Sequence, residues 1–86
     1  MLYEIENLKD ARLFLQGLNG KVTLTNPIGS TRYYGMRVID YIFKTLCQEF
    51  SEKIEGVIVN AYDDYSAFVT ARKLGYTQIT YFNRAA

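Results

Sequence analysis

The sequence predicts a single α/β domain over residues 1–86, with a short, mostly parallel three-stranded sheet and an N-terminal helix. Three observations support this fold class. Stretches with helical periodicity alternate with short β-like segments. The run Val57, Ile58 and Val59 is continuously β-branched, which is typical of a strand covered on both faces. Helices between the strands imply right-handed parallel crossovers, so we expect a βαβαβ domain with two or three layers.

The first helix is predicted to begin after Asn7, a residue type that caps helix N-termini, with Asp10 in the favourable first turn. Apolar residues then recur at helical spacing as far as Leu18, and Gly17 or Gly20 can end the helix. Residues 1–5 alternate too briefly to distinguish a short edge strand from a tail.

The first strand is predicted over residues 21–25, and Pro27 follows directly after Asn26 to stop it. A long helix is predicted from about residue 34 to residue 51. Its apolar arc is wider than the stripe of a simple surface helix, so either the first helix or another subunit should cover part of it. Tyr41 falls on the polar arc and should be partly exposed.

The remaining elements are a strand beginning at Gly56, a third helix and a last strand over residues 77–82. Asp64 is the expected N-cap of the third helix, and Gly75 fits the position just past its end. Three strands leave two open edges, which a small domain often protects by pairing with a second chain.

Composition excludes several classes of function. Ten basic and nine acidic residues give a net charge of +1, which is too balanced for electrostatic binding of nucleic acid or anionic membranes. The chain has one cysteine and no histidine, which argues against a metal site and a histidine-dependent triad, and we expect no cofactor. There is no signal peptide pattern and no apolar run of membrane-spanning length, so a cytoplasmic location is expected.

Ligands of parallel α/β sheets bind beyond the carboxyl ends of the strands. Three segments should converge there, namely residues 26–32, residues 60–66 and the pair Asn83 and Arg84. The candidate ligand-binding residues, for a small anion such as phosphate or a nucleotide, are Asn26, Gly29, Ser30, Thr31, Arg32 and Asp63. No dinucleotide fingerprint or P-loop is present, so the loop motif has low specificity.

Structural roles explain the same residues. Gly29 can shape the turn, and Ser30 or Thr31 can cap the following helix. Adjacent carboxylates such as Asp63 and Asp64 can bind Mg²⁺ or share a proton, but neighbours in sequence rarely converge. If Asp63 met Arg32, an ion pair would be the expected result rather than catalysis.

Eight tyrosines are many for this length, and tyrosine suits interfaces because it offers a large contact area with a polar end. The candidate interface residues are Tyr33, Tyr34, Tyr41, Tyr62 and Tyr65. The same tyrosines could instead line a ligand or belong to the core with their hydroxyls in solvent. Cys47 lies on the apolar arc of the long helix, where a buried thiol behaves as a small hydrophobe.

Three motifs resemble a group of small, uncharacterised α-proteobacterial proteins of about 90 residues. They are N-P-x-G-S-x-x-x-x-G from residue 26, N-x-x-D from residue 60 and A-x-x-x-A-x-K-x-G-Y from residue 67. The resemblance spans residues 13–82 and implies a fold but no established activity. The group carries a D-C-G-D-like acidic turn where this chain has Asn60, Ala61 and Tyr62, so an acidic or thiol site there would be lost.

Together these features predict a non-catalytic binding or interaction module that self-associates, most simply as a homodimer. A module that holds a small anion at the Gly29–Arg32 loop is the first alternative. A small enzyme that uses Asp63 as acid or base and Arg32 to stabilise charge is the second, and the sequence names no substrate for it.

Overall fold

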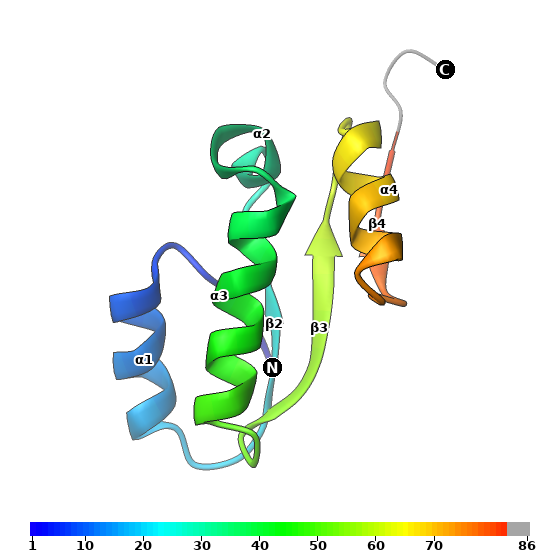
Figure 1. The fold of residues 1–86 in the computed structure, drawn as a ribbon. Helices are drawn as coiled ribbons and strands as arrows, with labels where there is room; N and C mark the ends of the chain where they lie inside the picture. The colour runs from blue at the N-terminus through cyan, green and yellow to red at the C-terminus, as the bar shows by residue number, and fades with distance from the viewer. Residues whose placement is uncertain (83–86) are drawn as a thin grey trace.

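The fold is seen in a computed structural model that describes residues 1–82. Strands and helices alternate along the chain, except that two helices follow one another between β2 and β3 (Figure 1). The elements are β1 (Leu2–Glu4), α1 (Leu8–Gly17), β2 (Val22–Thr25), α2 (Ser30–Tyr34), α3 (Met36–Glu49), β3 (Ile54–Asn60), α4 (Tyr65–Lys73) and β4 (Ile79–Thr80).

The sheet is entirely parallel and has the strand order β1-β2-β3-β4. The predicted α/β class and parallel sheet are confirmed, but the predicted three strands are wrong, because residues 2–4 form a fourth. Leu2 pairs with Thr23 and Glu4 with Thr25. Beyond the short β4, backbone bonds from Ala61 N to Thr80 O and from Asp63 N to Phe82 O, both 2.8 Å, continue the pairing of the two chain segments.

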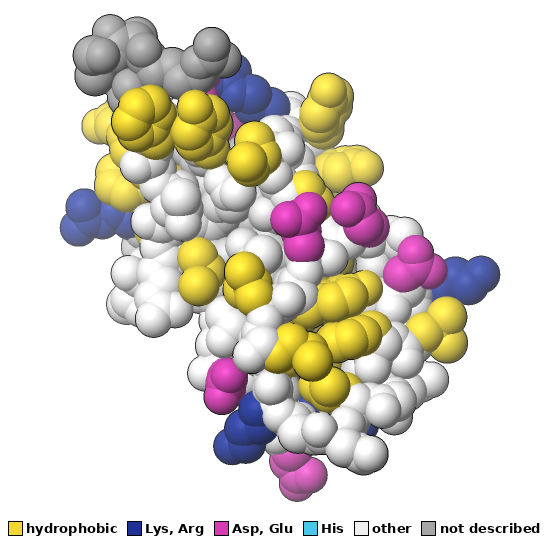
Figure 2. All heavy atoms as spheres, turned by 180° about the vertical axis from the view of Figure 1, so that it is seen from behind, with side chains coloured by type: hydrophobic (Ala, Val, Ile, Leu, Met, Phe, Trp, Pro, Cys, Tyr) yellow, Lys and Arg dark blue, Asp and Glu magenta, His cyan; other side chains and the backbone are white. Residues whose placement is uncertain are grey.

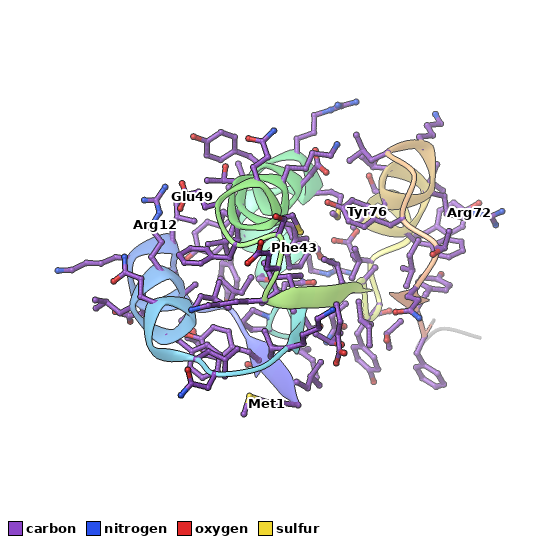
Figure 3. The ribbon with its side chains drawn as sticks, turned by 90° about the horizontal axis from the view of Figure 1, so that it is seen from below. Met1, Arg12, Phe43, Glu49, Arg72 and Tyr76 are labelled. Atoms are coloured by element: carbon purple, nitrogen blue, oxygen red, sulfur yellow. The ribbon has the colours of Figure 1, made fainter. Side chains whose placement is uncertain are left out.

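All the long helices lie on one side of this sheet, so the domain has two layers (Figure 3). This follows from the strand order. Each right-handed crossover moves to the next strand in the same direction, so α1, α3 and α4 are delivered to the same face. No helix within residues 1–82 covers the opposite face.

Local signals fix the helix ends as the sequence predicts. The Asn7 side chain accepts a 2.8 Å hydrogen bond from the Asp10 N–H, and the Asp64 carboxylate accepts one of 3.1 Å from the Ala67 N–H. These are N-caps in which a side-chain oxygen satisfies a free backbone donor. Gly75 follows α4 with φ +99°, the left-handed conformation that glycine adopts at low cost.

The predicted helix over residues 34–51 is wrong in its N-terminal part. Residues 30–34 form the separate helix α2, and Gly35 then interrupts the chain with φ 84° and ψ 149° before α3 begins at Met36. This φ is costly for residues with a Cβ. The resulting corner turns α2 away from the axis of α3 (Figure 1).

The core lies between the sheet and α3, which is flanked by α1 on one side and α4 on the other (Figure 3). This central position explains the wide apolar arc of α3, because neighbours lie on both flanks. The largest fully buried side chains are Phe43, Leu15, Leu24, Leu46, Val22, Val59 and Asn26. Tyr41 is 65% exposed, as predicted from its place on the polar arc.

Candidate functional site

The carboxyl ends of β2 and β3 are joined by the amide of Asn26, which is only 2% exposed. Its Nδ2 donates to the Asn60 carbonyl oxygen at 2.9 Å, and its Oδ1 accepts from the Asn60 N–H at 2.7 Å. The same Nδ2 donates to Ser30 Oγ at 2.8 Å, and Ser30 Oγ donates to the Pro27 carbonyl at 2.8 Å. The Asn26 side-chain amide thus makes the same two hydrogen bonds to the Asn60 backbone that a paired peptide group would make, and Asn26 acts as a structural clamp.

A second link joins the β2–α2 loop to the start of α4. Thr31 Oγ1 donates to Asp64 Oδ2 at 2.7 Å, while the other oxygen of the same carboxylate caps α4. Asp64 therefore has the capping role that the sequence predicts, and it also fixes the position of α2. Both hydroxyls of the predicted anion loop, Ser30 and Thr31, are engaged inside the protein.

Arg32 meets Asp63 across this rim. The guanidinium lies 3.8 Å from the Asp63 carboxylate and also donates to the Asp63 carbonyl oxygen. Asp63 adopts φ 55° at the turn before α4. Both side chains are well exposed, at 59% and 37%, so the pair is a surface ion pair of small energetic weight.

The candidate ligand-binding residues do not all face one cavity. Asn26 and Ser30 line a pocket on the β1 side of the loop, whereas Thr31 and Arg32 line a shallower hollow against α4, and Asp63 lines neither. Gly29 contributes a left-handed turn with φ +87° rather than a contact. The predicted pair Asn83 and Arg84 lies outside the described residues.

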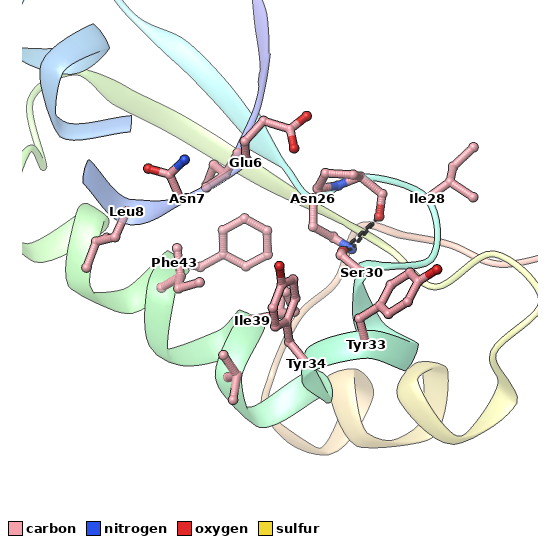
Figure 4. Close-up of a pocket in the computed structure, with 14 residues that line it drawn as sticks. Glu6, Asn7, Leu8, Asn26, Ile28, Ser30, Tyr33, Tyr34, Ile39 and Phe43 are labelled. Carbon is pink, nitrogen blue, oxygen red and sulfur yellow. Dashed lines mark hydrogen bonds between the residues drawn. The ribbon is translucent and has the colours of Figure 1, made fainter. Parts of the chain in front are cut away.

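The pocket has a volume of about 400 Å³ and lies between the β1–α1 loop, the β2–α2 loop and the exposed flank of α3 (Figure 4). We call it the β1–β2 pocket. Its lining residues are Ile5, Glu6, Asn7, Leu8, Asn26, Pro27, Ile28, Ser30, Tyr33, Tyr34, Val38, Ile39, Ile42 and Phe43. The sequence reasoning missed Glu6 as a site residue, because residues 1–5 were not assigned to the sheet.

The side of the sheet opposite the helices is a second candidate. Tyr3 stacks on Phe14 of α1 with ring centroids 4.1 Å apart, so its neighbours Leu2 and Glu4 project to the other side. A Cβ on Gly56 would lie 3.7 Å from Thr23 Oγ1, which places these two residues on that same side.

By the same alternation we define the open sheet face as Leu2, Glu4, Thr23, Thr25, Gly56, Ile58, Asn60 and Thr80, together with Tyr62 and Phe82 just beyond the ends of β3 and β4. Figure 2 views this side, where backbone and uncharged polar side chains form much of the surface, with hydrophobic and several acidic side chains among them.

The candidate interface tyrosines lie in four places. Tyr33 and Tyr34, 86% and 60% exposed, stand beside the β1–β2 pocket. Tyr41 lies on the solvent side of α3. Tyr65, the first residue of α4, packs against Tyr81, with ring centroids 6.0 Å apart. Tyr62 stacks on Phe82 at the corner of the open sheet face, with centroids 5.6 Å apart and planes 10° from parallel.

The one thiol is poorly suited to nucleophilic chemistry. Burial raises the pKa of Cys47, which keeps it protonated. Within residues 1–82, no three side chains of the histidine, cysteine, aspartate and glutamate types gather as a metal site would require. None of the helices in this range is both long enough and apolar enough to span a bilayer.

Comparison with known proteins finds a relative for nearly the whole chain. It is 48% identical over 85 residues to the uncharacterized protein RP547 of Rickettsia prowazekii, covering 99% of this chain and 80% of that protein. No family model and no solved structure matches the chain. The resemblance to small uncharacterised α-proteobacterial proteins is confirmed, and the chain belongs to the same family as the Rickettsia protein RP547.

Proposed function

We propose that the protein is a non-catalytic interaction module that self-associates as a homodimer through the open sheet face. The observation that supports this most is the placement of α1, α3 and α4 on one side of an all-parallel sheet (Figure 3). Parallel sheets are ordinarily covered on both faces, because their crossover helices and cores bury them. A second copy of the same face would supply the missing layer.

The chemistry of the open sheet face suits such a contact. Its centre, on β2 and β3, is formed by Thr23, Gly56 and Ile58, none of which is charged, while Thr25 on the same side is only 7% exposed. Depletion of charge at the centre is a feature of protein interfaces. The one acid of this face, Glu4, lies on the edge strand β1.

The area of the open sheet face shows that residues next to the strands must also take part in a dimer contact. Four strands about 4.8 Å apart, with 3, 4, 7 and 2 residues at about 3.3 Å each, offer roughly 250 Å². A stable interface needs about 800 Å² from each partner. The stacked rings of Tyr62 and Phe82 at the β3–β4 corner, with Phe82 57% exposed, are the apolar surface available to extend it.

A matched pair of leucines tests the proposal. Leu2 lies on the open sheet face and Leu13 on the outer side of α1, and both are 61% exposed. Sedimentation velocity of the wild type should give a dimer mass that falls on dilution. Leu2→Lys should shift the dissociation constant upward by at least about tenfold, because it places a charge in the contact, whereas Leu13→Lys should leave it unchanged.

A wild-type protein that stays monomeric at high concentration would remove the proposal. Equal effects of the two lysine substitutions would instead move the contact away from the open sheet face.

Anion binding at the Gly29–Arg32 loop is a second hypothesis, which the 59% exposure of the Arg32 side chain favours. Phosphate should then raise the melting temperature, and Arg32→Ala should abolish the gain. The engagement of Ser30 and Thr31 within the protein weakens this hypothesis, and it weakens the enzyme that would use Asp63 and Arg32 as well.

A further inference from the structure

We propose that the β1–β2 pocket binds a small organic cation that carries an apolar ring. The inference rests on the cavity and on which of its polar groups are available. It is independent of self-association through the open sheet face, because no residue of that face lines the pocket.

The pocket exists because α1 does not extend beside the N-terminal part of α3. The chain leaves β1 at Glu4 and enters α1 at Leu8, and α1 runs beside the C-terminal part of α3, so the N-terminal part of α3 has no helix on that side (Figure 1). Val38 on this flank is 46% exposed, although it is apolar and sits within a helix that is otherwise packed on both sides. Below it, the nearly buried side chains of Ile39 and Phe43 form an apolar base.

This volume suits a small molecule. Ligand pockets measure about 300–1,000 Å³ and are mostly apolar with a few polar groups. At about 400 Å³ the β1–β2 pocket is at the small end of that range. It also lies beyond the carboxyl ends of two neighbouring parallel strands, the position where α/β sheets bind ligands.

Most polar groups of the lining are already taken. Both Asn26 amide hydrogens bond to Ser30 and to the Asn60 carbonyl, and Ser30 itself donates to Pro27. The Asn7 amide donates to Asp10 Oδ2 at 2.9 Å and accepts from the Asp10 N–H. A ligand could use these groups only by breaking the clamp or the helix cap.

Three polar groups of the lining form no hydrogen bond or ion pair within residues 1–82: the Glu6 carboxylate and the hydroxyls of Tyr33 and Tyr34. No lysine or arginine lines the pocket. A carboxylate only accepts hydrogen bonds and carries negative charge, so the ligand group that meets it must be a donor or a cation.

Figure 4 shows Glu6 above the pocket on the loop side, with the rings of Tyr33 and Tyr34 on the opposite side toward α2. Aromatic faces attract cations through their quadrupole, and they also stack on flat rings. The rings and the carboxylate therefore favour the same ligand, a ring that bears an ammonium group.

Three isosteric probes test this chemistry: 2-phenylethylammonium, 2-phenylethanol and 3-phenylpropanoate. They share one ring and a two-carbon spacer but carry a positive, a neutral and a negative end. Each is titrated into ¹⁵N-labelled protein while amide shifts are followed by NMR. The ammonium should bind tightest and the carboxylate weakest, with shifts concentrated at residues 5–8, 26–34 and 38–43.

Variants separate the roles of charge and shape. Glu6→Gln should weaken ammonium binding about three- to fivefold, which is the effect of an exposed ion pair, and leave 2-phenylethanol unchanged. Val38→Arg should reduce binding of all three probes more than tenfold by filling the pocket. Tyr41→Arg is the control, since Tyr41 is exposed on α3 but does not line the pocket.

Three outcomes would contradict the proposal. Equal binding of the ammonium and the carboxylate would exclude a cation site. Absence of shifts with every probe, in the wild type and in the Leu2→Lys variant, would exclude a small-molecule site. Dissociation of a dimer by Val38→Arg would assign the pocket to a contact between copies. If Leu2→Lys did not dissociate the dimer, that result would count only against the open sheet face.

Discussion

The two faces of the sheet differ in what their residues contact. On the helix side, Val22, Leu24 and Val59 are fully buried beneath α1, α3 and α4. On the other side, Leu2 and Phe82 are more than half exposed, and Thr23 and Gly56 present little side-chain bulk. The same strands therefore bury one face in the core and leave the other face without a covering layer of helices. Stability should depend on the first face and assembly on the second.

The largest effect should come from the helix side. Leu24→Ala removes a fully buried side chain from the centre of the core, so it should cost about 3–5 kcal/mol in the free energy of unfolding. Urea denaturation followed by circular dichroism measures this. Leu13→Ala, at an exposed position, is the control and should change the free energy of unfolding little. If Leu24→Ala does not fold, Leu24→Val serves instead and should cost less.

The clamp at the carboxyl ends of β2 and β3 should come next. Asn26→Ala leaves both the N–H and the carbonyl of Asn60 without their partner, so we expect a loss of about 2–3 kcal/mol in the free energy of unfolding. The same denaturation assay measures it. A loss below about 0.5 kcal/mol would mean that water replaces the amide and that Asn26 is not a clamp.

The link between α2 and α4 should matter less. Asp64→Ala removes the cap of α4 and the acceptor for Thr31, at a cost of about 1–2 kcal/mol in the free energy of unfolding. Asp64→Asn is a suitable comparison, because its side-chain oxygen can still cap the helix. If the two variants were equally destabilised, the charge of Asp64 rather than its capping geometry would be responsible.

A substitution on the open face should barely affect the folded monomer. Ile58→Thr, measured at protein concentrations below those of self-association, should cost less than about 1 kcal/mol in the free energy of unfolding. The same variant should weaken the dimer when the mass is measured at high concentration. A loss as large as that of Leu24→Ala would show that the two faces are equivalent and would break the comparison.

The smallest effect should come from the ion pair between α1 and α3. The Arg12 guanidinium bonds both oxygens of Glu49, at 2.8 and 2.7 Å, and this holds the pKa of the Glu49 carboxyl below its usual range. A depressed folded-state pKa adds stability above the unfolded-state pKa, and this is lost as the pH falls through the folded-state pKa. The stability difference between wild type and Glu49→Gln should therefore vanish in acid, which denaturation at several pH values would show.

Much of the fold was predictable because it depends on local signals. The caps at Asn7 and Asp64 and the helix end before Gly75 each rest on a residue type with one preferred role. Strand β1 was not predictable from its three residues, since only pairing with β2 gives them a structure. Gly35 lies inside the helix predicted from about residue 34 to residue 51, and its interruption of that helix depends on a backbone conformation that the sequence does not reveal.

The candidate sites were harder to predict, because they depend on the strand order. With β1 beside β2, the β1–α1 loop becomes a wall of the pocket and brings Glu6 opposite Tyr34. The loop hydroxyls assigned to an anion turned inward, since the nearest acceptors for Ser30 and Thr31 belong to the protein itself. Whether the helices cover one face or both also follows only from the order β1-β2-β3-β4.

The central claim, that copies meet through the open sheet face, is tested most directly by isotope-filtered NOE spectroscopy. A mixture of ¹³C-labelled and unlabelled protein reports only contacts between different copies. We expect NOEs from the methyl groups of Leu2, Thr23 and Ile58 to protons of the unlabelled copy. Intermolecular NOEs confined to α3, for example to Val38, or none at all at a concentration where the mass is that of a dimer, would contradict the account.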